Sequence, residues 1–284
     1  MADAGLQTLS IQTVESLLNA LEDGGFNPVV ARNYENFPNF GHDLDLFVGR
    51  ELSDAVDLFR GVAKELNWDR LTLCDHYAAF DDDSLRIPVF RFHQFEPLQT
   101  LQVDLFGGLI LWGLPLRTRH QICAERQLEP RGRFHTMPPE WEQGYRIFQI
   151  QSLHPIKHAP KRTRYRERVI TFDDQHKGAL DTWGVAHGMG TLEAAVSALR
   201  DQDTDRLDQV IRQAKRRFAL GQMMRHPLRT MLRIKDRRRG LSVQFNERPC
   251  GPKVHLEGEP HEWSTWLDFL VEKQAFFKRC HCLL

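Results

Sequence analysis

Two aspartates, Asp43 and Asp45, are separated by one residue in the stretch FPNFGHDLDLFVGRE (37–51). Residues i and i+2 of a strand point to the same face, so both carboxylates project together while Leu44 and Leu46 face a core. Neighbouring carboxylates repel each other unless a cation lies between them. Mg²⁺ relieves that repulsion and prefers oxygen ligands. The pattern therefore predicts half of a metal site.

A third carboxylate is expected from a neighbouring strand, and LQTLQVDLFGG supplies Asp104 between two apolar residues. Three carboxylates that hold two divalent ions suit phosphoryl-group transfer, because the ions lower the pKa of an attacking hydroxyl and neutralise the leaving group. The alternative interpretation is a hydrated edge strand that carries incidental acids.

Hydrophobic periodicity predicts the elements that position these residues. The chain is predicted to be α+β, with a mixed sheet and flanking helices over 1–150, a mainly helical basic part over 151–240 and a short C-terminal segment over 241–284. The expected helices cover 9–22, 53–66 with Ser53 as N-cap, 191–200 with Thr191 as N-cap, and 204–224. Strands are expected in NPVVARNY, in DLDLFV and three times between Arg70 and Phe106.

Charge is distributed unevenly along a chain with no net charge. Residues 1–106 contain 18 Asp and Glu against 7 Lys and Arg, whereas the remainder contains 20 against 31. Such an arrangement suits an anionic substrate held between a metal-binding part and a basic part. The five scattered cysteines, the missing signal-peptide pattern and the lack of a long apolar run predict a cytoplasmic protein without a membrane span.

The strand VVARNY, the motif GHDLDLFV, a helix, a hairpin and then LQVDLFGG resemble the nucleotidyltransferase fold. That fold is shared by DNA polymerase beta, aminoglycoside nucleotidyltransferases and many small bacterial proteins. The stretches ARNYENFPN and LQVDLFGGLILWGLPL resemble more closely a bacterial branch often associated with surface-polysaccharide genes. The resemblance extends over roughly residues 10–220, and its specific motifs are the acidic ones.

The resemblance implies a role for each acidic residue. Asp43 and Asp45 would bind the Mg²⁺ or Mn²⁺ ions that hold a nucleoside triphosphate, ATP among the candidates. Asp104 would complete the metal site beside the acceptor hydroxyl. The wider superfamily has Gly-Ser after the first strand, where this chain has Arg32-Asn33. Arg32 could clamp phosphate with two hydrogen bonds and Asn33 could donate another; the alternative is a surface charge at a strand end.

The basic run KHAPKRTRYRER offers Lys161 and Arg164 as further candidates for triphosphate contact, although charge on a helix surface is the alternative. In the C-terminal segment, Gly258 and Ser264-Thr265 give the outline of a P-loop. The second glycine and the lysine of that motif are missing, so this segment is interpreted as structural.

The prediction is therefore a metal-dependent nucleotidyltransferase. It would move a nucleoside monophosphate from a nucleoside triphosphate to a hydroxyl or phosphate acceptor, with a sugar or polysaccharide intermediate among the candidates. The alternative is a protein with this fold but without catalysis, whose basic helical half binds nucleic acid or a protein partner.

Overall fold

The computed structural model describes residues 2–32, 34, 43–51, 54–76, 87–96, 98–111, 114–153, 155–228, 230–232 and 280–282. Its helices are α1 (Ala2–Asp23), α2 (Ala55–Glu65), α3 (Arg119–Ala124), α4 (Pro139–Ser152), α5 (Ala159–Gln175), α6 (Ala179–Ala186), α7 (Glu193–Arg200) and α8 (Thr204–Arg225). Its strands are β1 (Val29–Val30), β2 (Asp43–Phe47), β3 (Arg70–His76), β4 (Ile87–Phe95), β5 (Leu98–Leu105), β6 (Gly108–Leu111), β7 (Leu114–Thr118), β8 (Gln127–Leu128), β9 (His135–Thr136) and β10 (Cys280–Cys282).

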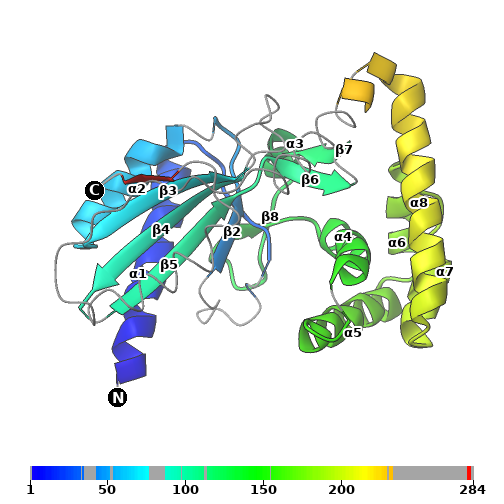
Figure 1. Cartoon of the computed structure of the whole chain (residues 1–284), viewed down its shortest axis with the longest axis horizontal. Helices are drawn as coiled ribbons and strands as arrows, with labels where there is room; N and C mark the ends of the chain where they lie inside the picture. The colour runs from blue at the N-terminus through cyan, green and yellow to red at the C-terminus, as the bar shows by residue number, and fades with distance from the viewer. Residues whose placement is uncertain are drawn as a thin grey trace, which may run out of the picture.

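Within the described residues, eight strands form one mixed sheet in the order β10-β3-β4-β5-β2-β1-β9-β8, and β6 pairs with β7 in a separate hairpin. The pairs β2–β5 and β1–β9 are parallel, and the other pairs are antiparallel. Figure 1 shows the sheet on one side of the molecule and the helices α4 to α8 on the other. The predicted α+β class, with a mixed sheet, flanking helices and a mainly helical later part, is confirmed.

The sheet presents an apolar face to α1 and α2. Side chains alternate along each strand, so every second residue of β5 is buried, namely Leu101, Val103 and Leu105. These side chains pack in one cluster with Leu17 of α1 and Phe59 of α2. The residues between them in β5, Gln102 and Asp104, point to the opposite face. One face of the sheet is therefore packed in this core, and the opposite face carries polar side chains such as Gln102 and Asp104.

A second hydrophobic cluster joins the end of the sheet to the helices. It combines Ala31 and Phe47, beside β1 and in β2, with the β6–β7 hairpin and residues of the later helices such as Ile147 and Ile211. Helix α4 spans the predicted domain boundary near residue 150, and that division stays a prediction. Of the predicted segment 241–284, only Cys280–Cys282 lies within the described residues, where it pairs with β3.

Two predicted helix caps are wrong. Helix α2 begins at Ala55 with Asp54 as its N-cap, one residue after Ser53. Helix α7 begins after Leu192 rather than Thr191, and Asp181 of α6 caps it from outside the helix. The Asp181 carboxylate accepts hydrogen bonds from the backbone N–H groups of Leu192 (2.6 Å) and Glu193 (2.7 Å). Such a cap depends on how two helices meet, which local spacing does not reveal.

Gly144 allows α4 and α6 to pack closely. A Cβ added there would lie 2.5 Å from Cε3 of Trp183, whose buried indole is rigid. We expect Gly144→Ala to lower the free energy of unfolding by about 1–3 kcal/mol, the usual cost of overpacking. Gly61→Ala in α2 is the matched control, because its Cβ would meet no atom within 4 Å, and it should stabilise by about 0.5–1 kcal/mol. Urea unfolding of both variants measures the difference; equal effects would contradict this account.

Candidate active site

The three predicted carboxylates lie on adjacent parallel strands. Asp45 of β2 is the direct neighbour of Asp104 in β5, and Asp43 is the neighbour of Gln102. Leu44 is buried in the opposite face, as the alternation of the strand predicts. Asp43 is exposed, Asp104 is half-buried and Asp45 is 0% exposed. The structure thus places the three carboxylates on the same face, in a short row from solvent into the protein.

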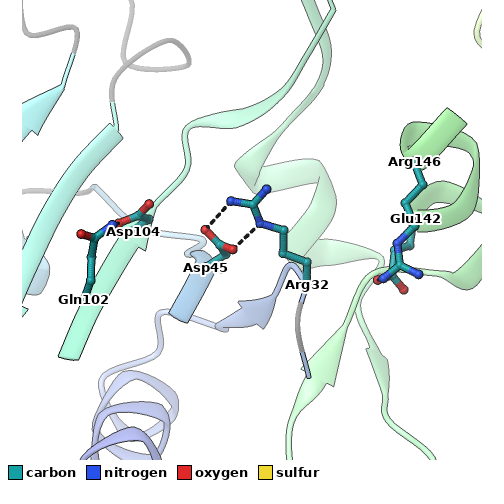
Figure 2. A network of polar contacts seen from close by, with 6 residues as sticks. All are labelled: Arg32, Asp45, Gln102, Asp104, Glu142 and Arg146. Atoms are coloured by element: carbon teal, nitrogen blue, oxygen red, sulfur yellow. Dashed lines mark hydrogen bonds and ion pairs between the residues drawn. The ribbon is translucent and has the colours of Figure 1, made fainter. Parts of the chain in front are cut away.

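Arg32 pairs with the buried Asp45. Backbone pairing brings it there, because β1 runs antiparallel to β2 and the Ala31 N–H donates to the Asp45 carbonyl at 2.8 Å. The guanidinium donates from Nε to Oδ2 and from Nη2 to Oδ1, the latter at 3.0 Å, so both carboxylate oxygens accept (Figure 2). Burial alone would lower the pKa of Arg32; its bond to Asp45 and the charge of Asp45 outweigh this and raise the pKa above its usual range.

Asp104 is held by a short polar chain on the same face. Arg91 of β4 donates from Nε to Gln102 Oε1 (3.0 Å), and Gln102 Nε2 donates to Asp104 Oδ1 (2.9 Å). Burial and then the charges of Asp45 and Asp43 raise the pKa of Asp104 to about 7. Burial and the neighbouring carboxylates together therefore favour a proton on Asp104 near neutral pH.

The donor chemistry of this row fits divalent cations, although the side chains do not form a ready-made site. Among the residues that the structure describes, no three Asp, Glu, His or Cys side chains converge closely enough to hold a metal ion. Figure 2 shows the Asp45 carboxylate turned toward Arg32 and away from Asp104. Repulsion from Asp45 and Asp43 adds to the effect of burial on the pKa of Asp104, and a divalent cation would relieve that repulsion. The carboxylate oxygens are therefore ligands of the right type, and both oxygens of Asp45 already accept hydrogen bonds from Arg32.

Ionisation of Asp104 is expected to make the protein less stable as the pH rises. Its pKa is about 7 in the folded chain and about 3.9 in an unfolded chain, so the folded state binds more protons between these values. The stabilisation from its proton is complete below about pH 4 and is lost as the pH rises through 7, a change of about 2–4 kcal/mol. Asp104→Asn removes this dependence and should be the more stable protein at pH 8.

Urea unfolding of the natural protein and Asp104→Asn from pH 4.5 to 8.5, in EDTA, tests this expectation. The difference between the two free energies of unfolding isolates Asp104, because all other titrating groups are shared. If the free energies of unfolding of the two proteins differ by the same amount at every pH in this range, Asp104 does not titrate there.

A small cavity lies beside Arg32, between the sheet and α4. Its volume is about 70 Å³, and its polar lining is Arg32, Glu142, Tyr145, Arg146 and Gln149. Glu142 and Arg146 are both buried and form an ion pair one helical turn apart. Tyr34 donates its hydroxyl hydrogen bond to the same Glu142 carboxylate. Glu142 is thus already partnered, and burial raises its pKa.

The two basic candidates in α5 surround an aromatic ring instead of the carboxylates. Lys161 Nζ lies 5.5 Å and the Arg164 guanidinium 5.8 Å from the centroid of the Tyr165 ring, and Arg146 lies at 5.2 Å. The structure does not bring Lys161 and Arg164 to the carboxylate row. The Tyr165 hydroxyl is buried and has no hydrogen-bond partner among the residues that the structure describes. Asn33, the remaining predicted contact, lies outside the described residues.

Sequence reasoning missed the residues that support the row. Gln102 could have been found, since it precedes Asp104 by two positions and must share its face. Arg91 could have been found only by pairing β4 with β5 in register. Glu142 and Arg146 are spaced four residues apart, as helical ion pairs are, but their position beside Arg32 depends on tertiary packing.

Comparison with known proteins gives distant similarity to solved structures. In the described part of the chain, no helix combines the length and apolarity needed to cross a bilayer. No protein-family model and no curated protein matches the sequence. An antigenic nucleotidyltransferase-like protein from Paracoccidioides brasiliensis aligns over 72% of this chain and 92% of its own, with 14% identity and a TM-score of 0.39.

Two solved proteins of Helicobacter pylori also align. One is described as a candidate nucleotidyltransferase; it covers 81% of this chain and 95% of its own, with 13% identity and a TM-score of 0.31. The other, JHP933, covers 78% and 95%, with 13% identity and a TM-score of 0.29.

Proposed function

We propose that this protein is a metal-dependent nucleotidyltransferase. The observation that carries the proposal is the pairing of Asp45 with Asp104 on adjacent parallel strands, with Asp43 two residues before Asp45 on the same face. Burial and then the charges of Asp45 and Asp43 raise the pKa of Asp104 to about 7, and an oxygen-preferring divalent cation would relieve the repulsion between the carboxylates. Because the two acidic motifs resemble those of the nucleotidyltransferase fold, we propose a nucleoside triphosphate as the substrate.

The proposed reaction moves a nucleoside monophosphate to an acceptor. The acceptor oxygen forms a bond to the α-phosphorus of the triphosphate, the bond to pyrophosphate breaks, and the acceptor loses its proton. Asp43, Asp45 and Asp104 would hold two divalent ions, Mg²⁺ or Mn²⁺, which when bound neutralise the leaving pyrophosphate and acidify the acceptor hydroxyl. Asp104 would complete the metal site beside the acceptor hydroxyl, and the proton that the acceptor loses would pass to solvent.

Positive charge for the phosphates would come from the chain itself. Arg32 lies beside the carboxylate row and can bind phosphate through two parallel hydrogen bonds. Positioning and charge stabilisation supply most of the rate in phosphoryl transfer, so few other groups are required. A hydroxyl of a sugar or polysaccharide intermediate is the acceptor class that the resemblance suggests.

The test is calorimetry with each of the four ribonucleoside triphosphates, with and without Mg²⁺. The natural protein should bind one of them at micromolar concentration only when Mg²⁺ is present. Asp43→Asn/Asp45→Asn should abolish that binding, while Asp57→Asn, an exposed change in α2, should keep it. Failure of all four triphosphates to bind would contradict the proposal.

A second function is favoured by one observation. Arg32 already neutralises Asp45 within the protein, and an ion pair of this kind needs no metal. The fold would then serve as a binding module without catalysis, with nucleic acid or a protein partner held by the basic helical half. Part of that charge is compensated, since Arg200 pairs with Asp173 and Asp174. Absence of nucleotide binding in the calorimetry would favour this second function.

A further inference from the structure

Arg32 and the expected metal ions compete for the same carboxylate. Both oxygens of Asp45 accept from the guanidinium, and the Asp45 side chain is 1% exposed. A carboxylate has further lone pairs, but a divalent cation that used them would lie within a few ångströms of a positive charge. Metal coordination by Asp45 therefore requires Arg32 to withdraw or requires a nearby anion to offset the repulsion.

The guanidinium can meet an anion without first losing its partner. The Arg32 side chain is 29% exposed, in contrast to the buried Asp45. Nε and Nη2 donate to Asp45, whereas Nη1 has no hydrogen-bond partner among the residues that the structure describes. Arg32 also lines the cavity beside α4, so there is space into which its side chain can turn.

We propose that Arg32 is an internal counter-ion of Asp45 that couples the binding of divalent metal to the binding of triphosphate. In the metal-free protein, Arg32 holds Asp45 and keeps metal affinity low. When the two ligands bind together, the phosphates take over the guanidinium and release Asp45 to the metal. This inference rests on the proposed function, and it assigns to Arg32 a positioning role distinct from a simple phosphate clamp.

The coupling predicts that Arg32→Gln strengthens the binding of Mn²⁺ alone and weakens the binding of Mg²⁺-triphosphate. Mn²⁺ alone, titrated by electron paramagnetic resonance without nucleotide, should bind about tenfold or more tightly than to the natural protein, because a nearby positive charge is removed. Mg²⁺-triphosphate, measured by calorimetry, should bind more weakly because the phosphates lose their partner. A residue that only supports the fold would weaken both kinds of binding.

Arg91→Gln is the matched control, since Arg91 is a buried arginine on the same face whose charge acts on Asp104 and Asp43. It should raise Mn²⁺ affinity much less than Arg32→Gln. The double variant Arg32→Gln/Asp45→Asn should not show the gain in Mn²⁺ affinity, because the Asp45 carboxylate that would bind the ion is then missing. Arg32→Lys keeps the charge and provides a second variant should the glutamine variant fold poorly; its Mn²⁺ affinity should stay near the natural value.

Different experimental results would contradict the counter-ion role of Arg32 and the proposed function. Unchanged Mn²⁺ affinity in Arg32→Gln, or a gain no larger than that of Arg91→Gln, would overturn the counter-ion role even if Mg²⁺-dependent triphosphate binding is observed. Failure of every triphosphate to bind would overturn the coupling together with the proposed function, and the nucleotide-free Mn²⁺ titration would still show whether Arg32 competes with metal for Asp45.

Discussion

Asp104→Asn is expected to abolish nucleotidyl transfer while leaving nucleotide binding largely intact. The substitution keeps the shape of the side chain and its position opposite Asp45, but removes a carboxylate proposed to hold the ion beside the acceptor hydroxyl. Without that ion the hydroxyl is no longer acidified, so the rate of transfer should fall by about 10²–10⁴-fold. Asp43 and Asp45 remain to hold the metal-bound triphosphate, so its affinity should change by less than about tenfold.

The measurement is pyrophosphate release at saturating triphosphate, with sugars and sugar phosphates offered as acceptors. Calorimetry on the same samples gives the affinity for Mg²⁺-triphosphate, and Asp57→Asn in α2 controls for loss of an exposed carboxylate. A variant that releases pyrophosphate at the natural rate would remove Asp104 from the reaction. A variant that fails to bind nucleotide would instead place Asp104 among the groups that hold the donor.

Arg146→Met is expected to produce the largest loss of stability among the substitutions considered. Arg146 is 3% exposed and pairs with Glu142, which is 5% exposed, so the substitution leaves a buried carboxylate without its cation. Breaking one side of such a pair costs about 3–5 kcal/mol. Glu142 can reduce this cost by taking a proton, because burial already raises its pKa. The loss should therefore be smaller at pH 5 than at pH 8.

Chemical unfolding of Arg146→Met, Glu142→Leu and the double variant at both pH values provides the test. The double variant should recover most of the loss, since two apolar side chains can replace a buried ion pair at little cost. Tyr34 loses its hydrogen-bond acceptor in Glu142→Leu, so that recovery should be incomplete. Additive losses in the double variant would show that the two side chains do not act as a pair.

Sequence reasoning predicted where the three carboxylates lie on the strands. Alternation along a strand is a local property, so the shared face of Asp43 and Asp45, and the burial of Leu44 behind them, follow from the sequence. The apolar-acidic-apolar pattern around Asp104 placed it on a second strand of the same kind. The structure makes that strand the immediate parallel neighbour of β2.

The contacts that cross between elements could not be predicted. The pairing of Arg32 with Asp45 depends on the antiparallel register of β1 and β2, which places Ala31 opposite Asp45. The sequence offered Arg32 as a phosphate ligand, because an arginine beside two acids does not reveal which anion it binds. The capping of α7 by Asp181 could not be predicted either, because Asp181 lies in α6 and local sequence spacing does not show that the two helices meet.

The parallel pairing of β2 with β5 has a consequence for the order of folding. Residues about sixty positions apart must meet before Asp45 and Asp104 become neighbours, whereas β4 and β5 form a local hairpin. Closing the longer loop costs more chain entropy, so we expect β2 to dock after the rate-limiting step, with low φ-values at Leu44 and Leu46. A ligand bound between the two strands should then slow unfolding while scarcely changing the refolding rate, giving the occupied protein a longer lifetime.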